Sequence, residues 1–163
     1  MRPAILNSIT RPAEILVLAG FFVLGAGAAG ASDPAASPQA VIETRQQGFK
    51  KMGAAMKALV EQLKSATPDN EKMTAAVQAI ATGSPEIPHW FPAGSGPEAG
   101  VDTDALPHIW EDRAKFDSLA NKLIPETKAL VTTVSGHDVA AIRMQMKAVA
   151  DVCSTCHKSF RAD

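Results

Sequence analysis

The sequence of 163 residues contains no tyrosine and only two cysteines, and aromatic residues make up 5% of it. The cysteines, Cys153 and Cys156, are separated by two residues. They cannot close a long loop, which excludes a fold held together by a disulfide framework. The few aromatic side chains leave little large apolar volume with which to fill a core. The formal net charge is −1 and no basic stripe is present, so nucleic acid is not an expected partner.

Residues 1–31 have the composition of a signal peptide. Arg2 and other charged residues precede an uncharged run over 15–30, and small residues lead up to a cleavage site after Ala31. The run is shorter than the roughly 20 apolar residues that a membrane span needs, so export is favoured over a retained anchor. We therefore expect the mature protein to be one periplasmic domain of residues 32–163.

Beyond residue 37, apolar residues recur at spacings of three and four, the pattern of helices that bury one face. This pattern predicts four helices, over about 38–64, 68–83, 107–124 and 139–160, with a kinked continuation of the third past Pro125 as an alternative. A long crossover rich in proline and glycine separates the second helix from the third. No segment alternates for long enough to predict a sheet. Two short connections and one long one indicate an antiparallel four-helix bundle.

The two cysteines lie in Cys153-Ser154-Thr155-Cys156-His157, the spacing of the attachment signal for c-type haem. Two thiols three residues apart lie on one side of a helix, and each can add to a vinyl group on one edge of a porphyrin. The imidazole of His157 can then reach the iron as proximal ligand, with its other ring nitrogen free to donate a hydrogen bond. The sequence therefore predicts one covalently attached haem c per chain.

Three other chemistries use the same cysteine spacing. A thioredoxin-like dithiol needs the motif at a helix N-terminus, whereas here it lies near the end of the last predicted helix. A structural zinc site needs four ligands, usually from two such knuckles, and the chain has one. A disulfide between two cysteines of one helical turn has unfavourable geometry. Haem attachment is therefore the favoured interpretation.

The signal peptide, the four predicted helices and the motif together resemble the cytochrome c′ family. The resemblance extends over residues 38–162. It is carried by residues 43–53, by Trp90-Phe91-Pro92-Ala93-Gly94, by Ile109-Trp110 and by Ser159-Phe160-Arg161. It implies an all-α, antiparallel four-helix bundle with a covalently attached haem.

The resemblance also implies dimerisation, because family members commonly form homodimers through their first helices. Small residues of the first predicted helix would permit close approach of a second chain; they are Gly53, Ala54, Ala55 and Ala58.

The resemblance further implies roles for residues near the iron. In the family, the residue four positions after the arginine of the first helix faces the iron. That residue is Phe49 here, four after Arg45. Phenylalanine cannot bind iron, so a five-coordinate haem with an occluded distal pocket is implied. Arg45 is expected to pair with a haem propionate, and Arg161 to lie beside the proximal His157.

Two alternatives for the sixth iron ligand are Met52 and Met56, whose thioether sulfurs lie on the apolar stripe of the first predicted helix. Either would make the protein a low-spin, six-coordinate electron carrier. A five-coordinate haem would instead bind nitric oxide or carbon monoxide and exchange single electrons with redox partner proteins. His89, His108 and His137 lie in or beside connections and are expected at the surface. No distal acid or base is evident, so an enzymatic function is not expected.

A covalently held porphyrin would supply the flat apolar mass that the sequence lacks. Burying several hundred Å² of it contributes on the order of 10 kcal/mol to folding. We expect a Cys153→Ala, Cys156→Ala double variant to be poorly folded, with helical circular dichroism well below that of the haem-bearing protein. Native helicity in the haem-free variant would show that the core is complete without the porphyrin.

Overall fold

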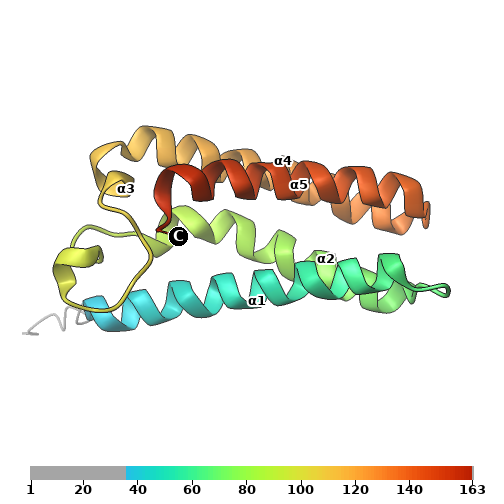
Figure 1. The fold of residues 1–163 in the computed structure, drawn as a ribbon, viewed down its shortest axis with the longest axis horizontal. Helices are drawn as coiled ribbons and strands as arrows, with labels where there is room; N and C mark the ends of the chain where they lie inside the picture. The colour runs from blue at the N-terminus through green and yellow to red at the C-terminus, as the bar shows by residue number, and fades with distance from the viewer. Residues whose placement is uncertain (1–35, 163) are drawn as a thin grey trace, which may run out of the picture. The chain divides into compact units, whose positions relative to one another are not determined.

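Residues 36–162 are described by a computed structural model (Figure 1), and the predictions for residues 1–35 lie outside this range. The elements are α1 (Pro38–Lys64), α2 (Asn70–Gly83), the 3-10 helices η1 (Ser84–Trp90) and η2 (Pro97–Ala99), α3 (His108–Glu111), α4 (Arg113–Ser135) and α5 (Val139–Phe160). No strand occurs between residues 36 and 162. The prediction of an all-α fold is confirmed. No helix of this range combines the length and the hydropathy of a membrane span.

The helix α1 begins and ends where the sequence predicts. The hydroxyl of Ser37 accepts a hydrogen bond from the backbone N–H of Ala40 (3.2 Å), and Pro38 occupies the first helical position. Most of the predicted apolar stripe is buried, with Ile42 and Leu59 wholly inaccessible to solvent, whereas Phe49 and Met56 are half-buried.

Two of the other predicted boundaries are wrong. The second helix begins at Asn70 rather than Pro68, because the carboxylate of Asp69 caps it and accepts from two backbone N–H groups. The third predicted helix is interrupted at Asp112, which ends α3 and caps α4. The helix α4 then passes Pro125 and continues to Ser135, as the alternative of a continued helix predicted.

Figure 1 shows two layers, α1 with α2 and α4 with α5. The layers meet mainly where α2 packs on α4, whereas α1 and α5 form no comparable interface in the described part of the chain. One hydrogen bond between those two helices runs from the Arg143 guanidinium to the Leu63 carbonyl. The helices α1 and α5 are therefore joined to each other less directly than the two helices of either layer are.

The helix α5, which bears the cysteine motif, depends on its own N-terminal cap. The carboxylate of Asp138 accepts hydrogen bonds from the backbone N–H groups of Ala140 (2.9 Å) and Ala141 (3.2 Å). We expect Asp138→Ala to lower the free energy of unfolding by about 1 kcal/mol, because two N–H groups lose their acceptor. Asp138→Asn is the matched control and should cost much less, since asparagine caps helices as well as aspartate does. Urea unfolding of both variants measures the difference.

Candidate functional site

The motif occupies the last two turns of α5. Cys153 and Cys156 are free thiols, half-buried and packed against the hydrophobic core. His157, one turn after Cys153, is more exposed than the thiols. The backbone N–H of Arg161 donates to the His157 carbonyl (3.0 Å) and closes the final turn. The structure therefore places both thiols on the inward side of the helix.

Burial controls the protonation of these groups. It raises the pKa of the Cys153 thiol, and it raises the pKa of Cys156 to about 11, with the neighbouring Cys153 adding to the effect. Thiols that stay protonated at neutral pH are the opposite of the activated thiolates in redox dithiols. Partial desolvation of the imidazole by the surrounding protein, and then the positive charge of Arg161, lower the pKa of His157. The imidazole is therefore neutral at pH 7, the form in which it binds metals.

Residues 104–106 fix the end of α5. The backbone N–H of Leu106 donates to the Phe160 carbonyl (3.0 Å), and the N–H of Ala162 donates to the Asp104 carbonyl (2.8 Å). The Asp104 carboxylate also pairs with the Arg161 guanidinium at 3.4 Å. Both side chains are more than half exposed, so the backbone bonds contribute more to this attachment than the ion pair does.

The six aromatic side chains of residues 36–162 form one connected cluster at this end of the bundle. Its ring contacts, measured between centroids, are Phe49–Trp90 (5.1 Å), Phe49–Phe91 (6.2 Å), Phe91–Trp110 (6.1 Å), Phe91–Phe116 (4.9 Å) and Phe116–Phe160 (5.3 Å). We call these six residues the aromatic cluster. It connects α1 to the end of α5, so a scarce residue type is concentrated where the motif lies.

Phe49 forms the α1 end of the aromatic cluster. Its ring meets the indole of Trp90 nearly at right angles, with an interplanar angle of 80°. The side chain is half-buried, whereas its other neighbour, Phe91, is buried. Phe49 is therefore in contact with two other aromatic rings.

Arg45, one turn before Phe49, is 2% exposed. Its guanidinium donates to the carbonyl (2.6 Å) and hydroxyl (3.1 Å) of Ser95 and to the hydroxyl of Thr103 (2.7 Å). It also lies 4.9 Å from the centroid of the Phe91 ring. Burial lowers the pKa of Arg45, and the negative charge of Glu98 partly offsets that effect. The side chain thus fastens the loop after η1 to α1 through neutral acceptors.

The two methionines proposed as alternative iron ligands differ in their surroundings. Met52 is buried, and its sulfur lies against the backbone of Gly83 at the end of α2, where a β-carbon on that glycine would stand 2.8 Å from it. Met56 is half-buried and packs against the core. The Met52 sulfur is therefore engaged with the end of α2, whereas Met56 is less deeply buried.

Three residues that sequence reasoning did not single out also shape the site. Ser95 and Thr103 receive the Arg45 guanidinium, and Gly48 allows close approach of Trp90. A glycine in the middle of a predicted helix was the only sequence signal for any of them. The three histidines of the connections are exposed, as expected, and His108 stacks on Phe160 with ring centroids 5.6 Å apart.

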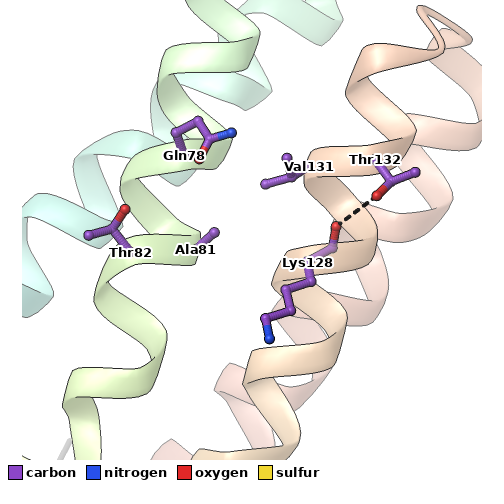
Figure 2. Close-up of a pocket in the computed structure, with 6 residues that line it drawn as sticks. All are labelled: Gln78, Ala81, Thr82, Lys128, Val131 and Thr132. Atoms are coloured by element: carbon purple, nitrogen blue, oxygen red, sulfur yellow. Dashed lines mark hydrogen bonds between the residues drawn. The ribbon is translucent and has the colours of Figure 1, made fainter.

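The chemistry of the donor set fits a covalently attached haem c. Two protonated, inward-facing thiols three residues apart precede a neutral imidazole, and the adjoining aromatic cluster offers flat apolar surface. No group of three or more histidine, cysteine or acidic side chains within residues 36–162 offers a competing metal site. A shallow groove between α2 and α4 (Figure 2) is lined by none of the motif residues; its lining is Gln78, Ala81, Thr82, Lys128, Val131 and Thr132.

The bonds of Arg45 give a prediction for the loop after η1. Replacing Arg45 with methionine removes three hydrogen bonds and leaves the Ser95 carbonyl and the Thr103 hydroxyl to find new partners. We expect the free energy of unfolding to fall by about 2–3 kcal/mol, with faster amide exchange over residues 95–105. Gln46→Ala is the matched control, because it removes one exposed bond to the same loop, to the Asp102 carbonyl (3.1 Å). An equal loss in both variants would contradict the anchoring role of Arg45.

Comparison with known proteins gives a consistent result. The family model described as Cytochrome C′ matches residues 40–161. The chain is 39% identical over 150 residues to a cytochrome c′ of Rhodopseudomonas palustris, covering 91% of this chain and 96% of the relative. It is 34% identical over 121 residues to a cytochrome c-556 of Agrobacterium tumefaciens, covering 74% and 95%. The crystal structure of cytochrome c′ from Thermochromatium tepidum superimposes with a TM-score of 0.74 at 25% identity, over 78% of this chain and 98% of that one. The chain belongs to the cytochrome c′ family and, like its relatives, carries a covalently attached haem c.

Proposed function

We propose that Cys153 and Cys156 hold the haem through two thioether bonds and that His157 is the proximal iron ligand. When bound, the haem supplies an iron that exchanges one electron and that binds a small gas where a coordination position is open. The inward-facing thiols and the neutral imidazole support this assignment. We further propose that the Arg161 guanidinium, whose charge acts on His157, makes oxidation of the iron less favourable.

We propose that the haem is five-coordinate and binds nitric oxide or carbon monoxide. The observation that carries this proposal is the placement of the two α1 side chains nearest the expected distal side. Phe49, which has no ligating atom, stands one turn after Arg45, and the nearest sulfur in the sequence, that of Met52, packs on Gly83. A side chain buried against α2 would have to leave that contact before its sulfur could bind iron.

In this proposal the phenyl ring of Phe49 does two things. It excludes water from the distal side, and it makes ligand entry costly because the ring must move aside. It also offers no hydrogen bond to a bound ligand, which disfavours dioxygen relative to nitric oxide and carbon monoxide. The aromatic contacts of Phe49 with Trp90 and Phe91 support a ring that resists displacement.

We propose that Arg45 pairs with a haem propionate. Its guanidinium is already buried and held by Ser95 and Thr103, with a lowered pKa but no carboxylate within bonding distance in residues 36–162. A buried cation held only by neutral acceptors gains from an anionic partner. A haem propionate would supply that partner.

We also propose export to the periplasm with removal of residues 1–31, and exchange of electrons with redox partner proteins there. A homodimer through α1 is proposed as well. Of the small residues expected at such an interface, Gly53, Ala54 and Ala58 are exposed and available, whereas Ala55 is buried within the bundle. Sedimentation of the haem-bearing protein measures its oligomeric state.

A low-spin electron carrier with Met56 as sixth ligand is the second candidate, because Met56 is half-buried on α1, whereas Met52 is buried against Gly83. The ferric absorption spectrum separates the two functions. We expect high-spin features and no methionine-to-iron charge-transfer band at the red end. We also expect Met56→Leu to leave the spectrum unchanged. A charge-transfer band that disappears in Met56→Leu would establish the electron carrier instead.

The proposed role of Phe49 gives a direct test. Phe49→Ala removes the ring that obstructs ligand entry, so the affinity for carbon monoxide should rise at least about tenfold, the equivalent of about 1.4 kcal/mol. Carbon monoxide titration of the reduced protein measures this change. Phe116→Leu, in the same cluster but not in ring contact with Phe49, is the control and should leave the affinity within about twofold. An unchanged affinity in Phe49→Ala would rule out Phe49 as the gate.

A further inference from the structure

We infer that Trp90 is a positioning residue for Phe49: the indole, seated on Gly48, fixes the Phe49 ring and so sets how readily a gas ligand can push it aside. This inference rests on the proposed gating role of Phe49 and deepens it. It means that displacement of the Phe49 ring by a ligand is opposed by a residue of η1 and not by α1 alone.

The indole of Trp90 packs against the backbone of α1 at Gly48, and we call this contact the seat of Trp90. A β-carbon on Gly48 would lie 2.3, 2.5 and 2.9 Å from three carbons of the six-membered ring of Trp90. These distances are far shorter than any ordinary carbon–carbon contact, so only glycine permits the indole to lie against the helix there. A β-carbon on Gly53, five residues later in α1, would have no other atom within 4 Å of it. The requirement for glycine is therefore specific to the site under the indole.

The seated indole is in direct contact with the residue that follows Gly48. The rings of Trp90 and Phe49 meet edge to face, with centroids 5.1 Å apart and an interplanar angle of 80°. This is a favourable arrangement for two aromatic rings. Because Gly48 and Phe49 are adjacent, an indole fixed against one is held at a constant place relative to the other. Phe49 cannot swing toward Trp90 unless the indole leaves its seat.

The backbone around Trp90 is fixed from the opposite layer. The Arg113 guanidinium of α4 donates to the carbonyls of Pro88 and Phe91, each at 2.7 Å, and its Nε donates to Asp117 at 2.8 Å. These bonds hold the chain on both sides of Trp90. The backbone around Trp90 is thus fixed by α4 and its indole ring by α1. The ring therefore limits the positions that Phe49 can adopt.

The test measures carbon monoxide association by flash photolysis of the reduced, haem-bearing protein. Trp90→Leu removes the indole and should raise the association rate constant about two- to tenfold, the range that corresponds to one aromatic pair. Trp90→Phe retains a ring and should restore a rate close to that of the parent. A rate in Trp90→Leu equal to that of the parent would overturn the inference.

A second pair of variants tests the seat. Gly48→Ala should displace the indole, raise the association rate and lower the thermal unfolding midpoint. Gly53→Ala, the matched control in open space, should leave the rate unchanged and raise the midpoint, because alanine favours the helix. In the Trp90→Leu background, Gly48→Ala should no longer change the rate, since no indole remains to displace. A rate change that persists in this background would show that Gly48 does not act through its contact with the indole.

A double-mutant cycle separates this inference from the proposed function. In the Phe49→Ala background, Trp90→Leu should have no further effect on the association rate, because there is no ring left to position. If Phe49→Ala alone changes neither rate nor affinity, the proposed gate fails. If Phe49→Ala raises both but Trp90→Leu changes neither, the gate stands and the positioning role of Trp90 fails. The ring-flip rate of ¹³C-labelled Phe49, measured by NMR in the carbon monoxide form, should rise in Trp90→Leu.

Discussion

Contact among six aromatic rings is the interaction on which the motif-bearing end of the bundle depends. The helices α1 and α5 do not pack closely on one another, and α2 and α4 join the two layers. At the end that carries the motif, the aromatic cluster joins α1 to α5 through ring contacts from Phe49 to Phe91, Phe116 and Phe160. The few aromatic residues of 36–162 are thus gathered at the end of the bundle that carries the cysteine motif.

Two arginines hold the segment between α2 and α3 against the helices. Arg45 of α1 and Arg113 of α4 both donate to the segment between α2 and α3, one to Ser95 and Thr103, the other to carbonyls on both sides of Trp90. Each guanidinium also lies over an aromatic ring. The segment forms the short helices η1 and η2 by its own bonds, and the two guanidinium groups attach it to the layers on either side.

Sequence periodicity predicted most of the fold, because each long helix buries one apolar face at spacings of three and four. The predicted bounds failed at Asp112, where a capping residue inside an apolar stripe starts a new helix, and at Asp69, whose carboxylate caps α2 one residue after Pro68. The motif residues were identifiable because their chemistry requires a fixed spacing. The partners of Arg45 and the seat of Trp90 were not, since both join positions that are 40 or more residues apart.

The pairing of helices within each layer bears on the order in which the protein assembles. The contacts of α1 with α2, and of α4 with α5, join neighbours in the sequence, so each helical hairpin can form by closing a short loop. Docking of the hairpins is the step that must bring distant segments together. The thiols lie on the second hairpin, which needs no contact from α1 to present them. If the haem is attached as proposed, its attachment does not have to wait for docking, because both thiols lie on the hairpin of α4 and α5.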